Sequence, residues 1–402
     1  MSASTLPPAP LGSRLHIWLL FGCQALGMTS NSILFTVAAL IGVALAPDPA
    51  WATLPLALLH LVTMITTIPA SMLMRRVGRR LGFQLGVLIG ITGTALGTTA
   101  VLTGSFGLFA VAMAFMGSFN AFLGFYRFAA IEVAPPDFGA RAVSLVIAGG
   151  VLAALFGAPM ARGFKDWIPE AEFAGCLVVM GLLLLPSLAI LSQISFPVPR
   201  QNSSKREGRP LGEIIRQPLF AVAALGSTVG YGMMVLVMTA TPLAMRMVPF
   251  TFGQTALVIQ WHVLGMFAPS FFTGSLIRRL GVTTVIAMGC GLTLVSCGIN
   301  LLGEGLGHYW FALLMLGLGW NFMFIGSTTL LTQSCTAEEA PKVQAAHDFL
   351  MFGSVTLAAL LSGGLLNRFG WSLVNGVSMP LVGVVLIALV WLHYQQVKPI
   401  HS

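Results

Sequence analysis

Polar side chains that could bind a small molecule interrupt two long apolar runs in the first half of the chain. Gln24 and Asn31 are seven residues apart in one run, and Asn120 and Arg127 are seven residues apart in another. Residues at i, i+4 and i+7 share a helical face, so each pair lies on one side of its helix. Amide and guanidinium groups in that arrangement can donate hydrogen bonds to an anionic or carbonyl-bearing compound.

The second half of the chain repeats this pattern. Asn321 and Thr328 follow Asn120 and Arg127 at a constant offset of 201 residues. The alternative is that the amides only join helices, through hydrogen bonds that average about 0.6 kcal/mol in membranes. For Arg127 the alternatives are an extended side chain that reaches the membrane surface, or an ion pair with Glu132.

Aromatic residues lie close to these polar positions. Tyr231 stands where Met28 stands in the first half, and Trp320 precedes Asn321 directly. Together with Trp261, they are candidates for the aromatic walls of a binding site. The competing interpretation is that these rings face lipid or pack in the core.

Three titratable residues lie inside apolar runs. His60 and His262 occupy near-equivalent places in the two halves, and imidazole titrates near neutral pH. We expect them to handle protons, with hydrogen-bonded packing as the alternative. Asp348 is an acidic residue well inside a run, about 9 Å from its end at 1.5 Å per residue. That depth favours a gate over a central site.

The composition is that of an integral membrane protein. Hydrophobic residues make up 56% of the chain, and charged residues make up 8%, against about 25% in soluble domains. The basic excess, 20 Lys and Arg over 12 Asp and Glu, is spread over short turns, which excludes a nucleic-acid-binding surface. The five cysteines show no metal-ligand spacing, so we expect no metal site.

Twelve apolar runs are long enough to span a bilayer, which takes about 20 residues in a helix. A Pro- and Arg-containing polar segment at 197–218 separates six runs from six, which predicts an all-α protein with bundles at 1–196 and 219–402. The runs cover residues 15–45, 54–73, 81–102, 106–131, 142–161, 173–191, 219–245, 255–277, 283–302, 309–331, 343–366 and 372–393.

A basic turn after the second run recurs after the eighth. Residues 71–80 and 274–281 correspond at an offset of 203, and Gly78 and Gly281 favour the positive φ that reverses a chain after a helix. With twelve spans, 15 of the 20 basic residues fall on the side of the termini and four on the other side, with Arg127 inside a span. The excess predicts that both termini are cytoplasmic, in an inner membrane.

Two sets of six spans, a basic linker and this turn resemble the major facilitator superfamily. The family pattern Gly-x-x-x-Asp-Arg-x-Gly-Arg-Arg is matched with Ser71 for the first Gly and Arg75 for the Asp. A degraded likeness to the Gly-Pro motif of the family's antiporters lies in the fifth span. The residues that carry these likenesses are Arg76, Gly78, Arg79 and Arg80 in the first turn, Gly274, Arg279 and Gly281 in the second, and Gly149, Gly157 and Pro159 in the fifth span.

The resemblance implies alternating access, in which two bundles rock about a central site lined by spans one, four, seven and ten. It also implies that the first turn packs on span eleven, so Arg75 and Asp348 would pair across the bundles. Further pairs would extend this gate, Glu132 with Arg76 or Arg79, and Glu338 or Glu339 with Arg279. The alternative is solvated charges worth about 0–1 kcal/mol per pair.

The chain has no nucleotide-binding loop, so we expect no cofactor and an ion gradient as the energy source. The titratable candidates favour protons over sodium, and uncoupled diffusion stays open. We expect a monomer in the lipid bilayer that takes up a small, partly aromatic nutrient, for example a vitamin such as riboflavin. Proton-driven efflux of drugs or metabolites is the alternative, and a receptor or enzyme is the alternative of another class.

Overall fold

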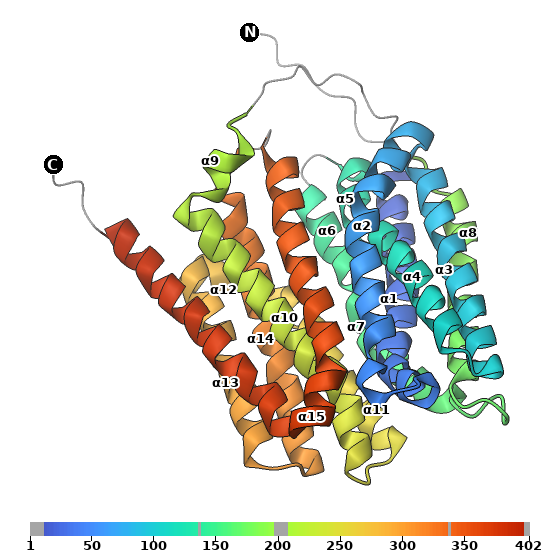
Figure 1. Cartoon of the computed structure of the whole chain (residues 1–402). Coiled ribbons are helices and arrows are strands. Elements are labelled where there is room, and N and C mark those ends of the chain that lie inside the picture. The colour runs from blue at the N-terminus through green and yellow to red at the C-terminus, as the bar shows by residue number, and fades with distance from the viewer. Residues whose placement is uncertain (1–11, 136–137, 197–207, 337–338, 398–402) are drawn as a thin grey trace.

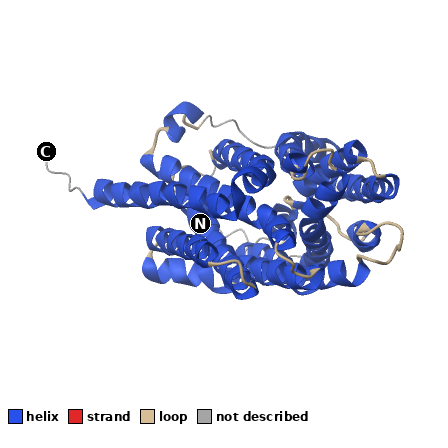
Figure 2. Ribbon diagram, turned by 60° about the horizontal axis from the view of Figure 1, so that its bottom comes forward, coloured by secondary structure: helices blue, strands red, loops and turns tan. Residues whose placement is uncertain are grey.

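The computed structural model describes residues 12–135, 138–196, 208–336 and 339–397. These residues form helices and connecting loops, with no strand among them, as Figure 2 shows. Two groups of helices stand side by side in Figure 1, the first in blue to green and the second in yellow-green to red. The prediction of an all-α membrane protein is confirmed.

The first group consists of six spans, two of which are broken. Span four is α4 with α5, and span five is α6 with α7. The bounds are α1 Gly12–Leu45, the 3-10 turn η1 Pro49–Trp51, α2 Leu54–Val77, α3 Arg79–Thr103, α4 Phe106–Leu123, α5 Tyr126–Val133, α6 Gly139–Ile147, α7 Gly149–Phe164 and α8 Ala174–Ser192.

The second group also contains six spans, once two features are recognised. Helices α11 and α12 are one span bent by 45°, and α15 is two spans, because Gly370 has φ 80° and ψ 177° within it. Figure 1 shows α15 descending in orange and returning in red. The bounds are α9 Leu211–Ile215, α10 Pro218–Met247, α11 Phe252–Phe267, α12 Ser270–Leu280, α13 Val282–Leu302, α14 Leu306–Thr332 and α15 Ala340–Val397.

The two basic turns have the same backbone conformation. Gly78 ends α2 at φ 86° and ψ 159°, and Gly281 ends α12 at φ 88° and ψ 152°. Glycine adopts this region readily, whereas other residues are strained there. The predicted positive φ at both glycines is confirmed, and the following helix begins at the next residue.

The bundles are closed on one side of the membrane. We call the side that carries α9 the linker side and the opposite side the far side. Every residue from Met234 to Met245, in the far half of α10, is buried, whereas buried and accessible residues alternate in its linker-side half. In α1, residues 29–41 are buried apart from Phe35. The equivalent spans of the two bundles are therefore enclosed on the far side and accessible on the linker side.

Among the described residues, hydrogen bonds join the two bundles on the far side and near the centre. Thr53, before α2, accepts from the N–H of Gly363 at 3.2 Å and lies 3.5 Å from the carbonyl of Leu360, both in α15. Gln260 of α11 donates to the carbonyl of Leu155 in α7 at 3.5 Å. These contacts join the first bundle to the second where α1 and α10 are enclosed.

Candidate functional site

Arg127 lies just after a break in span four. Helix α4 ends at Leu123 and α5 begins at Tyr126, so the guanidinium extends from the first turn of α5. It lies over the ring of Phe128, with 4.8 Å to the centroid, and within electrostatic range of Asp348 and Tyr231 in the second bundle. Arg127 does not pair with Glu132, and its Nε has no partner among the described residues.

An aromatic cluster, formed by Tyr231, Trp320, Phe324 and Phe352, lies beside Arg127. Tyr231 of α10 meets the rings of Trp320 at 5.3 Å and Phe324 at 5.8 Å, both of α14. It also meets Phe352 of α15 at 6.4 Å. Trp320 and Phe324 are stacked, with 7° between their planes. Two of these rings, Phe324 and Phe352, were not singled out from the sequence, because many phenylalanines in a membrane protein face lipid.

The amides of the first bundle are brought together. Asn31 of α1 donates to Asn120 of α4 at 2.7 Å, which joins two of the spans expected to line the site. Gln24 lies on the same helix as Asn31. The side-chain oxygens of Gln24 and Asn31 are buried without a hydrogen-bond partner in the described chain. These two oxygens are therefore acceptors that the described protein leaves unpaired.

Asn321 is used differently from Asn120. Its amide donates to the carbonyl of Met266 at 2.6 Å and to Ser270 at 2.8 Å, and it accepts from Thr273 at 2.7 Å. Those three residues flank the bend between α11 and α12, where Pro269 interrupts the helix. Asn321 is 1% exposed. In this state it stabilises the bend and is not available to a substrate.

Trp261 lies apart from the aromatic cluster. It is 37% exposed and packs against Trp310, at 5.2 Å between ring centroids. Trp310 in turn contacts Phe311, which is 54% exposed. Trp261 thus belongs to an aromatic group that is exposed on the outer surface of the second bundle, on α11 and α14.

The two membrane histidines are packed on the far side. His60 stacks on Phe35 at 5.9 Å with 9° between the rings. His262 lies 2.8 Å from the carbonyl of Leu313 through Nδ1, and its Nε2 has no partner among the described residues. Both are buried in this state, and their role in proton handling stays a prediction.

A third histidine, which the sequence analysis missed, lies next to Asp348. His347 of α15 is 1% exposed and contacts Asp348 through Nδ1 at 3.0 Å. Its Nε2 lies 2.6 Å from the hydroxyl of Ser227 in α10. Asp348 is partly exposed, with a side-chain exposure of 33%. Arg75 is exposed and makes no ion pair with Asp348 in this state.

The other predicted gate pairs do not join the bundles. Arg79 donates to Glu132 through two nitrogens, but both residues belong to the first bundle and link α3 to α5. Arg76 and Arg279 are exposed, without an ion pair to a described residue. Glu338 lies outside the described residues. In this state Glu339 binds Arg209 instead of Arg279, and its pairing with Arg279 stays a prediction for the state closed on the linker side.

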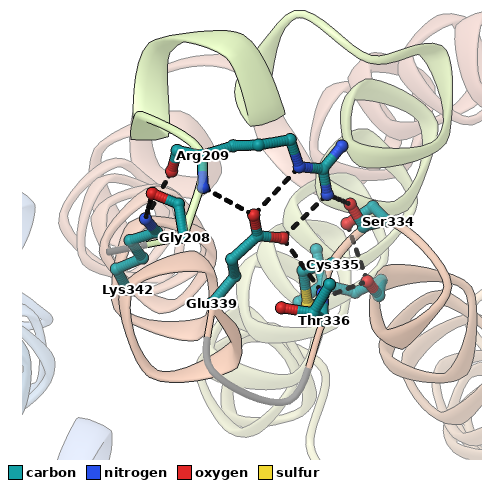
Figure 3. Close-up of polar contacts among 8 residues, drawn as sticks. Gly208, Arg209, Ser334, Cys335, Thr336, Glu339 and Lys342 are labelled. Carbon is teal, nitrogen blue, oxygen red and sulfur yellow. Dashed lines mark hydrogen bonds and ion pairs between the residues drawn. The ribbon is translucent and has the colours of Figure 1, made fainter. Parts of the chain in front are cut away.

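Figure 3 shows these contacts of Arg209, which we call the linker clamp. Arg209 donates to Glu339 at 2.7 and 2.9 Å and to the carbonyl of Ser334 at 3.2 Å. Lys342 donates to the carbonyls of Gly208 and Arg209. The Arg209 guanidinium and the backbone N–H of Thr336 hold the pKa of Glu339 down at about 2. The clamp fixes the segment before α9 to the loop between α14 and α15.

Helices that span the membrane, two bundles of six spans, and a charged and aromatic group between them define a transporter of small molecules. Comparison with known proteins agrees. The sequence model of the Major Facilitator Superfamily matches residues 20–353. A crystal structure of the transporter FucP in the outward conformation has a TM-score of 0.62 at 15% identity, over 94% of this chain and 99% of that chain.

Two curated proteins extend the comparison. The riboflavin transporter RfnT of Brucella anthropi is 40% identical over 380 residues, which cover 94% of this chain and 96% of that protein. The uncharacterized MFS-type transporter YdeG of Bacillus subtilis is 28% identical, over 87% of this chain and 86% of that protein. The chain belongs to the Major Facilitator Superfamily and is a multi-pass membrane transporter, not an enzyme.

Proposed function

We propose that this protein imports riboflavin, or a flavin closely related to it, and that protons drive the uptake. The observation that carries the proposal is the aromatic cluster beside Arg127. The 40% identity to a riboflavin transporter supports the choice of compound.

The chemistry of the cluster matches that of a flavin. The isoalloxazine ring is planar and aromatic, and ring pairs such as those in the cluster contribute about 0.5–1.5 kcal/mol beyond buried area. The carbonyl edge of the ring suits a guanidinium, which presents several donors in one plane. The ribityl hydroxyls can donate to the unpaired oxygens of Gln24 and Asn31. Asn120 positions Asn31 for this contact.

The proposed direction is from the far side to the linker side, with the linker side cytoplasmic. The basic residues favour that orientation, because positive charge accumulates on cytoplasmic loops. It places both termini in the cytoplasm and the protein in the inner membrane. The structure then represents the cytoplasm-facing step, after the far side has closed. We further propose that the monomer is functional and that the boundaries of the bundles lie at residues 196 and 219.

Efflux by proton antiport is the competing function. The two functions are separated by expressing the gene in a bacterial riboflavin auxotroph that lacks flavin uptake. We expect growth at low external riboflavin with the wild-type gene and little growth with Arg127→Ala at equal membrane abundance. Absence of growth, together with reduced sensitivity to toxic compounds, would favour efflux.

A further inference from the structure

We propose that His347 and Asp348, with Ser227, form the proton-binding site of this transporter, and that Arg127 is the charge that competes with the bound proton. The inference rests on the proposed proton-coupled uptake and names the residues that carry the coupling. It replaces His60 and His262 as the first candidates for that role. The three residues of the site join α10 to α15, and Arg127 faces them from the first bundle.

The three side chains form a continuous row. Ser227 Oγ lies 2.6 Å from His347 Nε2, and His347 Nδ1 lies 3.0 Å from an oxygen of Asp348. Ser227 and His347 are buried, whereas the Asp348 side chain is 33% exposed. The row therefore has one end in the protein core and the other end accessible.

The same positions satisfy two protonation states. In the first, the Ser227 hydroxyl donates to Nε2, and Nδ1–H donates to the Asp348 carboxylate. In the second, the ring carries both protons, Nε2–H donates to Ser227, and the hydroxyl turns to the backbone carbonyls of Ala223 and Ala224, both 3.1 Å away. The row gains one proton by rotation of one hydroxyl. No donor or acceptor in the row loses its partner, so neither state carries the cost of an unpaired buried group.

The charged and titratable groups around the row determine what the proton does. Arg127 of α5 lies within electrostatic range of Asp348, at the accessible end of the row, and also of Tyr231 of α10. Without the extra proton the row carries a net charge of minus one, which attracts the guanidinium of Arg127. With it, His347 and Asp348 neutralise each other, and the attraction weakens.

This attraction acts between the bundles, because Arg127 belongs to the first and Asp348 to the second. Deprotonation therefore favours closure on the linker side, and protonation favours the open arrangement of the present structure. A ligand shifts a conformational equilibrium when it interacts more favourably with one of the two states. Here the proton is the ligand, and the two states are those closed and open on the linker side.

The test uses the full-length protein in proteoliposomes with radiolabelled riboflavin. With one proton per substrate, a gradient of about one pH unit (~1.4 kcal/mol) drives about tenfold accumulation. We expect His347→Gln and Asp348→Asn to abolish this accumulation while they retain exchange of labelled for unlabelled riboflavin without a gradient. The matched control is Ser354→Ala, which removes another hydrogen bond between α15 and α10 and should accumulate normally. Normal accumulation by His347→Gln with an unchanged pH profile would overturn the proposal.

A second measurement tests the proton site independently of the proposal that riboflavin is the substrate. Without substrate, spin labels at Val77 and Gln344, in a cysteine-free background, report the distance between α2 and α15 on the linker side. We expect the wild type to favour the longer distance at lower pH, and His347→Gln to lose this dependence. If riboflavin is not transported but this pH response depends on His347, the substrate is wrong and the proton site stands. A pH response that persists in His347→Gln would refute the site.

Discussion

Asn120 and Asn321 occupy equivalent places in the sequence, but their amides have different surroundings. Asn120 accepts from Asn31, whose own oxygen is unpaired, whereas Asn321 makes three hydrogen bonds at the bend between α11 and α12. The repeat therefore preserves the residue type but not its role. An amide with all its partners inside the protein contributes to stability, and an amide network with a free acceptor can bind a ligand.

This difference predicts opposite phenotypes for the two alanine variants. At about 0.6 kcal/mol per hydrogen bond between membrane helices, Asn321→Ala should lose roughly 2 kcal/mol of stability. We expect its Tm in detergent to fall, with little change in KM at low temperature. Asn120→Ala should raise KM and change Tm much less. Equal Tm losses with unchanged KM in both would show that Asn120 is also only structural.

The sequence identified most of the polar residues near the site, because a polar side chain inside an apolar run stands out. It did not identify the row, since Ser227 and His347 are 120 residues apart and their contact depends on how α15 packs on α10. Nor could it separate Trp261 from Trp320, because both follow the same apolar pattern. Burial, which decides between them, is a property of the packed bundle.

At the scale of the helices, the two basic turns depend on glycine. Gly78 and Gly281 have φ near 87° with extended ψ, a region that costs other residues about 1–3 kcal/mol. No neighbouring atom lies within 4 Å of a Cβ added at either position, so the cost is one of backbone conformation alone.

We therefore expect Gly78→Ala and Gly281→Ala each to lower the free energy of unfolding by about 1–3 kcal/mol. Gly107→Ala is the control, because Gly107 lies in α4 with open space around it and without a positive φ. A fluorescence melting curve in detergent measures the three Tm values. A Tm for Gly78→Ala no lower than that of Gly107→Ala would contradict the backbone argument.

The linker clamp adds a pH dependence on the linker side. The pKa of Glu339 is lowered from its usual value of 4.5 to about 2, mainly by the guanidinium of Arg209. A carboxyl with a lower pKa in the folded state contributes stability above its unfolded pKa, and this contribution is lost as the pH falls through the folded value. The stability that the Glu339 carboxylate contributes should therefore be lost between about pH 4.5 and 2.

Glu339→Gln tests this assignment. The variant should be less stable than the wild type at pH 7 and should approach the wild type below pH 4.5, because the wild-type carboxyl is then losing its charge. Tm values measured at intervals across this range check the expectation, with Glu213→Gln on α9 as a control. A constant difference between Glu339→Gln and the wild type down to pH 2 would contradict the lowered pKa.

The twelve spans and the glycine turns were predictable, because long apolar runs in a bilayer have few alternatives to a helix. The breaks at Gly124 and at Ala148 were not, since neither position contains proline. Pro269 bends its span, whereas Pro69 lies inside a continuous α2. Whether a proline bends a membrane helix thus depends on the neighbouring helices, as Asn321 illustrates.

At the scale of the whole molecule, alternating access requires the closed far side to open. The loop before α2 meets α15 there, and a Cβ added at Gly363 would lie 3.0 Å from the Thr53 hydroxyl. Cysteines at both positions have the proximity that a disulfide needs.

The variant with Thr53→Cys and Gly363→Cys should therefore form a disulfide under oxidation and lose transport, because the far side can no longer open. Reduction should restore transport, and neither single variant should respond to the oxidant. Undiminished uptake by the cross-linked protein would mean that this contact is not part of the moving interface.

The central claim is that the two bundles carry riboflavin inward at the expense of a proton gradient. The most direct measurement is uptake of radiolabelled riboflavin by proteoliposomes that hold the purified wild-type protein in one orientation, with the outside acidified. We expect riboflavin to accumulate inside the proteoliposomes above its external concentration. We also expect a protonophore to abolish this accumulation. Riboflavin that only equilibrates, or that is expelled against its gradient when the outside is acidic, would contradict it.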